Sequence, residues 1–205
     1  GEVIDPSLVL AIISEYIIKH SAKKKIIVEV RTSRVVRDWV ERAGGNVKTT
    51  ICWTIPMKLE MKSDEEVAFT GETSGHLLFR ETHESDDAVF GALTFLQAIS
   101  VKEETIDEIV KKFKKEYFVL EEQNFKINTA DEAIKILKKI KTKYASEGAQ
   151  ILEIDGLSVI FPNWWFNLRM SETEPFIRLN LEASSKELFD TKSAEMINLI
   201  NSYIK

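Results

Sequence analysis

The chain has 205 residues, 44% of them hydrophobic, and its 28 Lys and Arg residues against 33 Asp and Glu residues give a net charge of −5. That length and composition can form one large or two small domains with a sizeable core. Nucleic acid and anionic membrane surfaces favour basic partners, so we expect neither as the main partner of this acidic chain.

A single cysteine, Cys52, excludes an internal disulfide and a thiolate metal cluster, and it fits a reducing, cytoplasmic setting. We expect it to be a small buried apolar residue. The sequence has no apolar run near the roughly 20 residues of a membrane-spanning helix. Its first 20 residues also lack the basic start of an export signal.

The first half of the sequence alternates between helix and strand patterns. Asp5-Pro6 predicts a helix start, because Asp caps helices and Pro suits their first turn. The residues after it have helical spacing and share an apolar face: Leu8, Val9, Ile12, Ile13, Tyr16 and Ile17. Strand-like segments at 25–30 and 47–52 flank a predicted helix at 35–43. This alternation predicts a layered α/β domain, which we place at residues 1–103.

That domain is expected to close with a helix that follows Asp86, whose Val89, Leu93, Leu96 and Ile99 share a face. A charged connector at 101–115 comes next. Thr105 and Glu108 have the spacing of a capping box, which predicts a short helix there instead of a flexible linker.

The second half, residues 104–205, has a different order of predicted helices and strands. A strand-like segment at 117–127 precedes a predicted helix, which Thr129 and Glu132 cap and along which Ile134, Leu137 and Ile140 line up. Three or four strands follow, and then a last helix from about Thr191. We therefore expect a smaller α+β domain with strands packed on two helices, so that the fold class of the whole chain is α/β.

Four residues with phosphate-binding chemistry fall on one turn near the C-terminus, between apolar, strand-like runs: Arg169, Ser171, Thr173 and Arg178. Two guanidiniums offer forked donors, and two hydroxyls and the turn amides add further hydrogen bonds, which together suit an anion such as phosphate. The same residue types are also ordinary in a solvated hairpin turn.

A second polar loop, 70–76, lies about a hundred residues earlier between two apolar runs. The pairing of Gly-Glu-x-Ser-Gly-His with the later Arg-x-Ser-x-Thr-Glu-Pro-x-x-Arg resembles the alpha-D-phosphohexomutases, the phosphomannomutase/phosphoglucomutase family. The resemblance covers the whole chain but only half of the family's usual chain. It implies the third and fourth of the family's four domains.

In that family the first loop reads the sugar hydroxyls and the second holds the phosphate. The resemblance therefore implies sugar binding by Glu72 and Ser74, and phosphate binding by the four residues of the later turn. A carboxylate accepts from two vicinal hydroxyls and a serine both donates and accepts, which suits a hexose. His76 is a candidate for proton transfer to a sugar hydroxyl, since its ordinary pKa lies near neutrality; a purely positioning role is the alternative.

Arg31 sits where the family's residues face the cleft, and Lys58 matches the Lys that follows a Gly-His pair in the family, so the resemblance makes both further candidate contacts. Two departures from the family pattern stand beside them. Trp53-Thr54 replaces a Gly-His pair, so that one expected contact is missing, and Glu172 replaces a Gly or Asn in the phosphate loop. A carboxylate there would stand beside a dianion unless it turned outward.

Three other features receive simpler interpretations. Trp164 and Trp165 are adjacent on a predicted strand and must face opposite sides, so we expect packing roles for them instead of a stacking platform. His20 and His83 are expected on the surface.

The family's catalytic parts do not occur in this sequence, which has neither the phosphoserine loop nor the Asp-x-Asp-Gly-Asp loop that holds Mg²⁺. The resemblance thus implies a parent enzyme whose N-terminal domains carry these parts, with Mg²⁺ and a hexose bisphosphate activator. The chain itself is expected to supply no metal ligand and to be inactive alone. The first five residues resemble the sequence that follows the family's metal loop, so we expect a fragment of a longer mutase, with a naturally short chain as the alternative.

The leading hypothesis is the substrate-recognition half of a phosphomannomutase or phosphoglucomutase, which interconverts the 6-phosphate and 1-phosphate of a hexose. A non-catalytic phosphosugar-binding or regulatory module and a glucosamine-type mutase are the alternatives. Thr73, between the two sugar-loop residues, matches no subgroup and leaves the hexose open.

Overall fold

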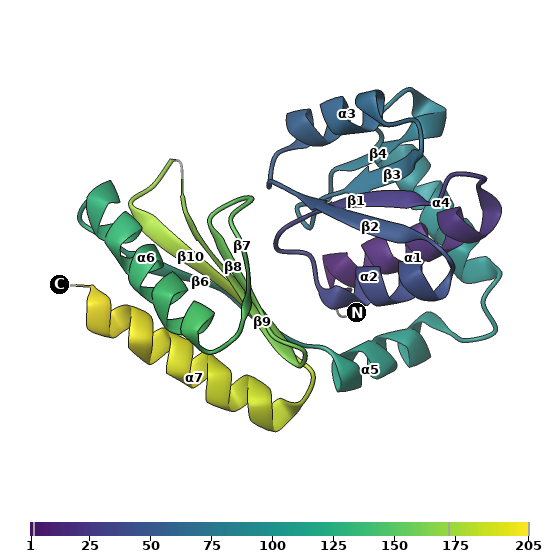
Figure 1. Cartoon of the computed structure of the whole chain (residues 1–205). Coiled ribbons are helices and arrows are strands. Elements are labelled where there is room, and N and C mark those ends of the chain that lie inside the picture. The colour runs from purple at the N-terminus through teal and green to yellow at the C-terminus, as the bar shows by residue number, and fades with distance from the viewer. Residues whose placement is uncertain (2, 172, 205) are drawn as a thin grey trace. The chain divides into compact units, whose positions relative to one another are not determined.

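The computed structural model describes residues 1, 3–171 and 173–204. The chain divides into two compact units, Gly1–Lys114 and Lys115–Lys205 (Figure 1). Each unit has its own five-stranded sheet. The fold is the expected combination of an α/β unit and an α+β unit.

The first unit is a mixed sheet with helices on both faces. Its sheet order is β2-β1-β3-β4-β5, in which β1 is parallel to β2 and β3, while β4 and β5 are antiparallel to their neighbours. The elements are α1 (Pro6–His20), β1 (Lys25–Glu29), α2 (Arg34–Arg42), β2 (Asn46–Thr50), α3 (Thr54–Ser63), β3 (Val67–Gly71), β4 (Leu77–Phe79), a 3₁₀ turn η1 (Arg80–Thr82), β5 (Ser85–Asp86), α4 (Ala88–Ser100) and α5 (Ile106–Glu116).

Local signals in the sequence account for most of these elements. Asp5 caps α1 as expected, and its carboxylate accepts from the Ser7 amide at 2.8 Å. The capping box of α5 is also present, because Thr105 and Glu108 each accept from the other's backbone amide at 2.8 and 3.3 Å. Helices α1 and α2 cover one face of the sheet and α3 covers the other (Figure 1).

Helix α3 was not expected from the sequence. Met57 and Met61 are fully buried and pack on Ile27 of β1, while Ile55 and Leu59 are exposed. Its apolar residues therefore do not form a single stripe, and Trp53 at the N-cap position offers no capping side chain. The helix depends on tertiary packing, which the sequence pattern did not reveal.

The apolar face predicted on α4 exists, but it points to solvent. Val89, Leu93 and Leu96 are 73, 60 and 56% exposed, whereas the residues that α4 buries are the smaller Gly91, Thr94 and Ala98. Helical spacing places residues on a common face but does not say whether a neighbour covers it.

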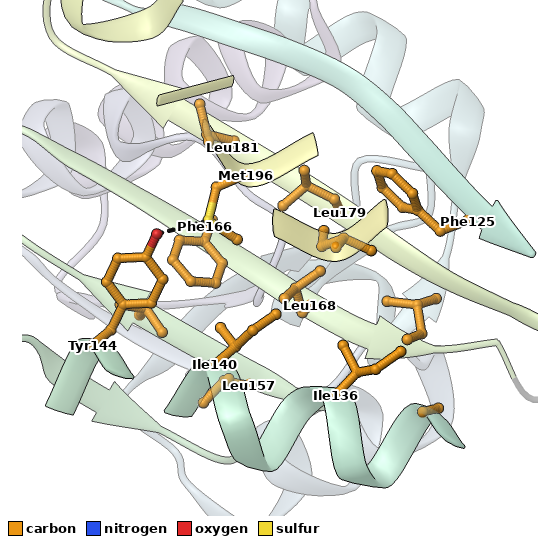
Figure 2. Packing of buried hydrophobic residues seen from close by; sticks show 14 of the residues in the cluster. Phe125, Ile136, Ile140, Tyr144, Leu157, Phe166, Leu168, Leu179, Leu181 and Met196 are labelled. Carbon is orange, nitrogen blue, oxygen red and sulfur yellow. Dashed lines mark hydrogen bonds between the residues drawn. The ribbon is translucent and has the colours of Figure 1, made fainter. Parts of the chain in front are cut away.

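The second unit is an antiparallel sheet of order β6-β10-β9-β8-β7, with α6 and α7 on one face (Figure 1). The elements are β6 (Phe118–Lys126), α6 (Ala130–Ser146), β7 (Gln150–Leu152), β8 (Leu157–Ile160), β9 (Trp164–Met170), β10 (Phe176–Ala183) and α7 (Lys186–Tyr203). Figure 2 shows the core between helices and sheet, where Tyr144 of α6 packs beside Phe166 of β9 and its hydroxyl bonds to the Met196 sulfur of α7.

Two predictions for this unit were wrong in detail. Ile134 is 55% exposed, because the buried face of α6 consists of Ala133, Ile136, Ile140 and Tyr144. The last helix begins at Lys186 instead of near Thr191, since the Ser185 hydroxyl accepts from the Leu188 amide and caps it.

The two tryptophans of β9 behave as the strand period requires. Trp164 belongs to the core, where it stacks on Phe161 at 5.1 Å between ring centroids, and Trp165 points to the opposite face. Both are buried.

His20 and His83 are exposed, as predicted. Among the described residues, no helix is both long and apolar enough to cross a membrane.

Gly156, in the turn between β7 and β8, allows a test of how backbone strain and a steric clash affect the stability of the second unit. Its φ is +69°, and a Cβ there would lie 2.3 Å from the Leu168 carbonyl oxygen. Gly148 has a similar φ of +83° with open space around it. We expect Gly156→Ala to lower the free energy of unfolding by about 3 kcal/mol and Gly148→Ala by about 1 kcal/mol, since only the first adds a clash to backbone strain. Urea unfolding of both variants measures this, and equal losses would contradict it.

Candidate functional site

The predicted sugar-binding loop, residues 70–76 and called the sugar loop below, contains the tight connection between β3 and β4 in the first unit. The Gly75 amide donates to the Glu72 carbonyl and the Glu72 amide donates to the His76 carbonyl, both at 3.0 Å. Gly75 has a φ of +98°, which favours glycine. These bonds fix the backbone on which the three predicted sugar-site residues stand.

Glu72 is only 6% exposed, and both of its carboxylate oxygens accept hydrogen bonds. Thr54 Oγ1, at the start of α3, donates to one oxygen at 2.5 Å, and Ser74 Oγ donates to the other at 3.0 Å. Thr54 belongs to the pair that departs from the family pattern, and it makes a direct contact with the predicted sugar carboxylate. Lys58 lies one turn further along α3 and is half-buried.

His76 is paired with an acidic residue that was not predicted for the site. Its Nδ1 lies 2.5 Å from Asp86 Oδ2, and Asp86 Oδ1 accepts from the Leu77 amide at 3.0 Å. The chain returns to this position because His83 and Glu84 both have left-handed φ values, 57° and 54°, after which β5 pairs with β4. Two consecutive non-glycine residues in this region are unusual and set the direction of the turn.

This pairing changes the acid–base chemistry of the imidazole. The hydrogen bond that His76 donates to Asp86 raises the pKa of His76 above its ordinary value, against a lowering by burial, and the charges of Asp86 and Glu72 add to the rise. With Nδ1 held by Asp86, Nε2 is the nitrogen left to exchange a proton with a ligand.

Arg31 lies just beyond β1 and bonds to Glu29, with 3.1 Å from its Nε to the carboxylate. The sequence interpretation of Cys52 was wrong. Its side chain is only partly buried, and its thiol donates to Glu29 Oε2 at 3.0 Å, so it is part of a polar network and not a small apolar filler. Glu29 gave no sequence signal of its own, because its partners lie in three separate loops.

The phosphate stretch of the second unit connects β9 to β10. Arg169 and Arg178 are direct cross-strand partners, and strand alternation places both on the sheet face opposite the helices. Arg178 Nη2 donates to Ser171 Oγ at 3.1 Å. Thr173 is exposed in the loop. Glu172, predicted to weaken phosphate binding, lies outside the described residues.

Glu122 of β6 connects the two arginines, and sequence analysis did not find it. Its carboxylate lies 3.5 Å from Arg169 Nη2 and 3.6 Å from Arg178 Nη1, and it accepts from Asn180 at 3.0 Å. Glu174 pairs with Arg178 at 3.1 Å on the exposed side. Two positive charges thus face two negative charges, and these two carboxylates hold the guanidiniums in place.

The guanidiniums retain unused hydrogen-bonding capacity. In the part of the chain that the structure describes, the buried Nε atoms of Arg169 and Arg178 have no hydrogen-bond partner. Buried donors without a partner are uncommon in proteins and call for an explanation such as an absent ligand or water. The described residues contain no group of three or more His, Cys, Asp or Glu side chains that could hold a metal ion.

Comparison with known proteins agrees with the motifs. Residues 5–117 match the family model of phosphoglucomutase/phosphomannomutase, alpha/beta/alpha domain III, and residues 99–199 match the model of the C-terminal domain of the same proteins. The chain belongs to the phosphoglucomutase/phosphomannomutase family. The two matches follow one another in the order expected for the family's third and fourth domains.

Two named relatives show how far the similarity extends. A phosphomannomutase of Methanocaldococcus jannaschii is 33% identical over 201 residues, which cover 98% of this chain and 43% of the relative. A Pyrococcus horikoshii protein named "probable phosphoglucosamine mutase" is 29% identical and is covered to 45%. The chain therefore spans less than half the length of these curated relatives.

Solved structures support the fold in the same way. A phosphoglucomutase/phosphomannomutase family protein from Burkholderia thailandensis has a TM-score of 0.80 at 20% identity, with 99% of this chain and 43% of that chain covered. A phosphomannomutase-like structure from Thermus thermophilus has a TM-score of 0.67 at 16% identity, with coverage of 95% and 41%. At these identities the likeness shows a shared fold.

The His76–Asp86 pair predicts a measurable titration. The pKa of His76 in the folded chain should lie above its ordinary value of about 6.5, and Asp86→Asn should lower it. Because the folded state favours the protonated ring, the pair's contribution to stability is present below pH about 6.5 and is lost as the pH rises through the raised pKa. Two-dimensional NMR of the imidazole checks this. Asp190→Asn, on α7 of the other unit, is the control, and an equal shift in both variants would contradict the pairing.

Proposed function

We propose that this chain is the substrate-recognition half of a phosphohexomutase, which interconverts hexose 6-phosphate and hexose 1-phosphate by phosphotransfer through a bisphosphate intermediate. The observation that carries this is the assembly of motif residues within each unit. Glu72 and Ser74 bond to each other, and Arg178 bonds to Ser171 and shares Glu122 with Arg169. Membership of the family supports the reaction class.

In this proposal Glu72 accepts hydrogen bonds from a pair of sugar hydroxyls. Its present donors are hydroxyls of Thr54 and Ser74, which can rotate and become acceptors for the sugar as it binds. His76, held at Nδ1 by Asp86, takes or gives a proton at Nε2. Arg31 and Lys58 are further contacts, and their cationic groups suit a phosphate or a hydroxyl.

Phosphate binding then requires an exchange of partners at the second loop. Glu174 is the easier carboxylate to displace, because its side chain is 56% exposed and exposed ion pairs are worth little. Glu122 can remain and keep the two guanidiniums in position. Ser171 and Thr173 add hydroxyl donors, and a phosphate dianion accepts charge-assisted bonds from both arginines.

The remaining chemistry belongs, in this proposal, to N-terminal domains of such an enzyme. We assign Mg²⁺ and the phosphoserine to those domains, because the family's phosphoserine loop and metal loop do not occur in this sequence, and we assign the hexose bisphosphate activator to the complete enzyme. Mg²⁺ would offset charge on the transferred phosphoryl group. The one cysteine keeps a reducing, cytoplasmic setting as our expectation.

Two alternatives remain open to test. A non-catalytic phosphosugar-binding or regulatory module is favoured by the internal occupancy of Glu72, whose two oxygens already have donors. A glucosamine-type mutase is favoured by the similarity to the Pyrococcus horikoshii protein. The choice among mannose, glucose and glucosamine depends on comparing the affinities of their 1-phosphates.

Arg169→Ala should weaken binding of mannose 1-phosphate by at least about tenfold, because a charge-assisted hydrogen bond contributes roughly 1.5–3 kcal/mol. Isothermal titration calorimetry measures the affinity, and circular dichroism checks the fold. Lys141→Ala, which removes the same charge from α6 of the same unit, is the matched control. Unchanged affinity in a folded Arg169→Ala protein would remove Arg169 from the site.

The chain alone should bind a phosphohexose in the millimolar range, about 4 kcal/mol, and convert none of it, even with Mg²⁺ and a hexose bisphosphate. Phosphoryl transfer needs a donor serine and a metal whose motifs are absent from its sequence. A coupled assay of mannose 1-phosphate conversion to mannose 6-phosphate tests this. Conversion above the buffer blank that Arg169→Ala abolishes would contradict the proposed division of labour.

A further inference from the structure

Glu29 is a buried carboxylate at the carboxyl end of β1. It is 1% exposed, and strand alternation places it on the same side of the sheet as Ile27, which packs against α3. A charged group in such a position is costly unless it is paired and hydrogen-bonded. Its contacts therefore indicate what it is there to hold.

The two oxygens of Glu29 bind three separate loops. Oε2 accepts from the Arg31 amide at 2.6 Å and from the Cys52 thiol at 3.0 Å. Oε1 accepts from the Thr73 hydroxyl at 2.5 Å and faces the Thr73 amide at 3.4 Å. These partners follow β1, β2 and β3, whose carboxyl ends meet at one edge because the strands are parallel. Ligands of α/β sheets bind at this edge.

The carboxylate is held in its charged form. Burial raises the pKa of Glu29, but the Arg31 charge and the hydrogen bonds from Cys52, Thr73 and the Arg31 amide outweigh burial and keep the pKa below its ordinary value. An ionised acceptor makes hydrogen bonds about twice as strong as a neutral one. Thr73 is thus attached to the sheet by a strong bond.

We propose that Glu29 is the positioning residue of the sugar loop, acting through Thr73. Thr73 stands between Glu72 and Ser74, so fixing its hydroxyl and amide fixes the two side chains on either side of it. This gives a role to the one loop residue that matches no subgroup of the family. Its consequence for sugar binding rests on the proposed function, but its consequence for loop order does not.

Hydrogen exchange of the loop amides tests the proposal without any ligand. Thr73→Val keeps the side-chain shape and removes the hydroxyl, while Thr73→Ser keeps the hydroxyl. We expect Thr73→Val and Glu29→Gln to raise exchange at Glu72 and Gly75 at least about tenfold, the factor at the lower end for a hydrogen bond to a charged group. The Thr73→Ser protein should behave like the wild type, and the double variant should be no faster than the faster single variant.

Glu15→Gln is the control, because Glu15 is a partly buried carboxylate of this unit whose pKa is lowered like that of Glu29, but its partners are Lys102 and Lys19. It should leave exchange in the loop unchanged. Equal exchange in Thr73→Val and Thr73→Ser, or additive effects in the double variant, would overturn the proposal. The comparison of Thr73→Val with Thr73→Ser tests the proposal even where the Glu29→Gln protein does not fold.

A binding measurement then separates this role from the proposed function. Thr73→Val should weaken mannose 1-phosphate binding about fivefold and leave inorganic phosphate binding unchanged, since the proposed function assigns the sugar to this loop and the phosphate to the arginine pair of the second unit. Equal losses for both ligands would overturn the positioning role. Absence of mannose 1-phosphate binding by the wild-type chain, with exchange as expected, would instead refute the proposed function and leave Glu29 as the residue that orders the loop.

Discussion

The parallel pairing of β1 with β2 and β3 is the constraint on which the first unit's candidate site depends. It brings the ends of three strands to one edge, so that residues 29, 52 and 73 meet although they are far apart in the chain. A polar network can form there because one buried carboxylate accepts from all three loops. Without a shared acceptor, the loops would each have to be ordered by their own short-range bonds alone.

In the second unit, the alternation of side chains along each strand brings the candidate phosphate-binding residues together. On β10, Ile177, Leu179 and Leu181 enter the core, so Arg178 must face the other way, beside its cross-strand partner Arg169. Two guanidiniums so close together repel each other unless an acid lies between them. Glu122 meets this need from β6, at the point where the register between β6 and β10 shifts. The bulge and the basic pair are thus parts of one arrangement.

The parts of the fold that the sequence predicted are those set by residues close in the chain. Asp5, Thr105 and Thr129 cap helices through bonds that span only two or three residues, and such signals can be recognised in a sequence. It was harder to predict which apolar residues of α3 and α6 are buried, because Ile55 and Ile134 are as hydrophobic as the buried residues of the same helices. Which face is covered depends on neighbours from elsewhere in the fold.

The candidate site divides in the same way. Glu72, Ser74, Arg169 and Arg178 carry the motif and were predicted from it. The acidic partners of other loop residues and of the arginines were not: Glu29 binds Thr73, Asp86 binds His76, and Glu122 lies against Arg169 and Arg178. Acidic residues are common in this chain, and only the fold brings these three to their partners. Cys52 was misjudged for the same reason, since its donor role exists only next to Glu29.

Internal pairing in both loops limits what a ligand can gain from either unit by itself. The oxygens of Glu72 already accept from Thr54 and Ser74, and Glu122 and Glu174 already balance the arginines. In the proposed function, a phosphosugar would therefore exchange existing hydrogen bonds for new ones, and its net gain would be the difference between the two sets. That difference grows when water is excluded, because charge-assisted bonds strengthen in a lower dielectric. On the proposed function, the internal pairing of each loop would therefore favour binding of a ligand from which water is excluded and would make binding in open solvent weak.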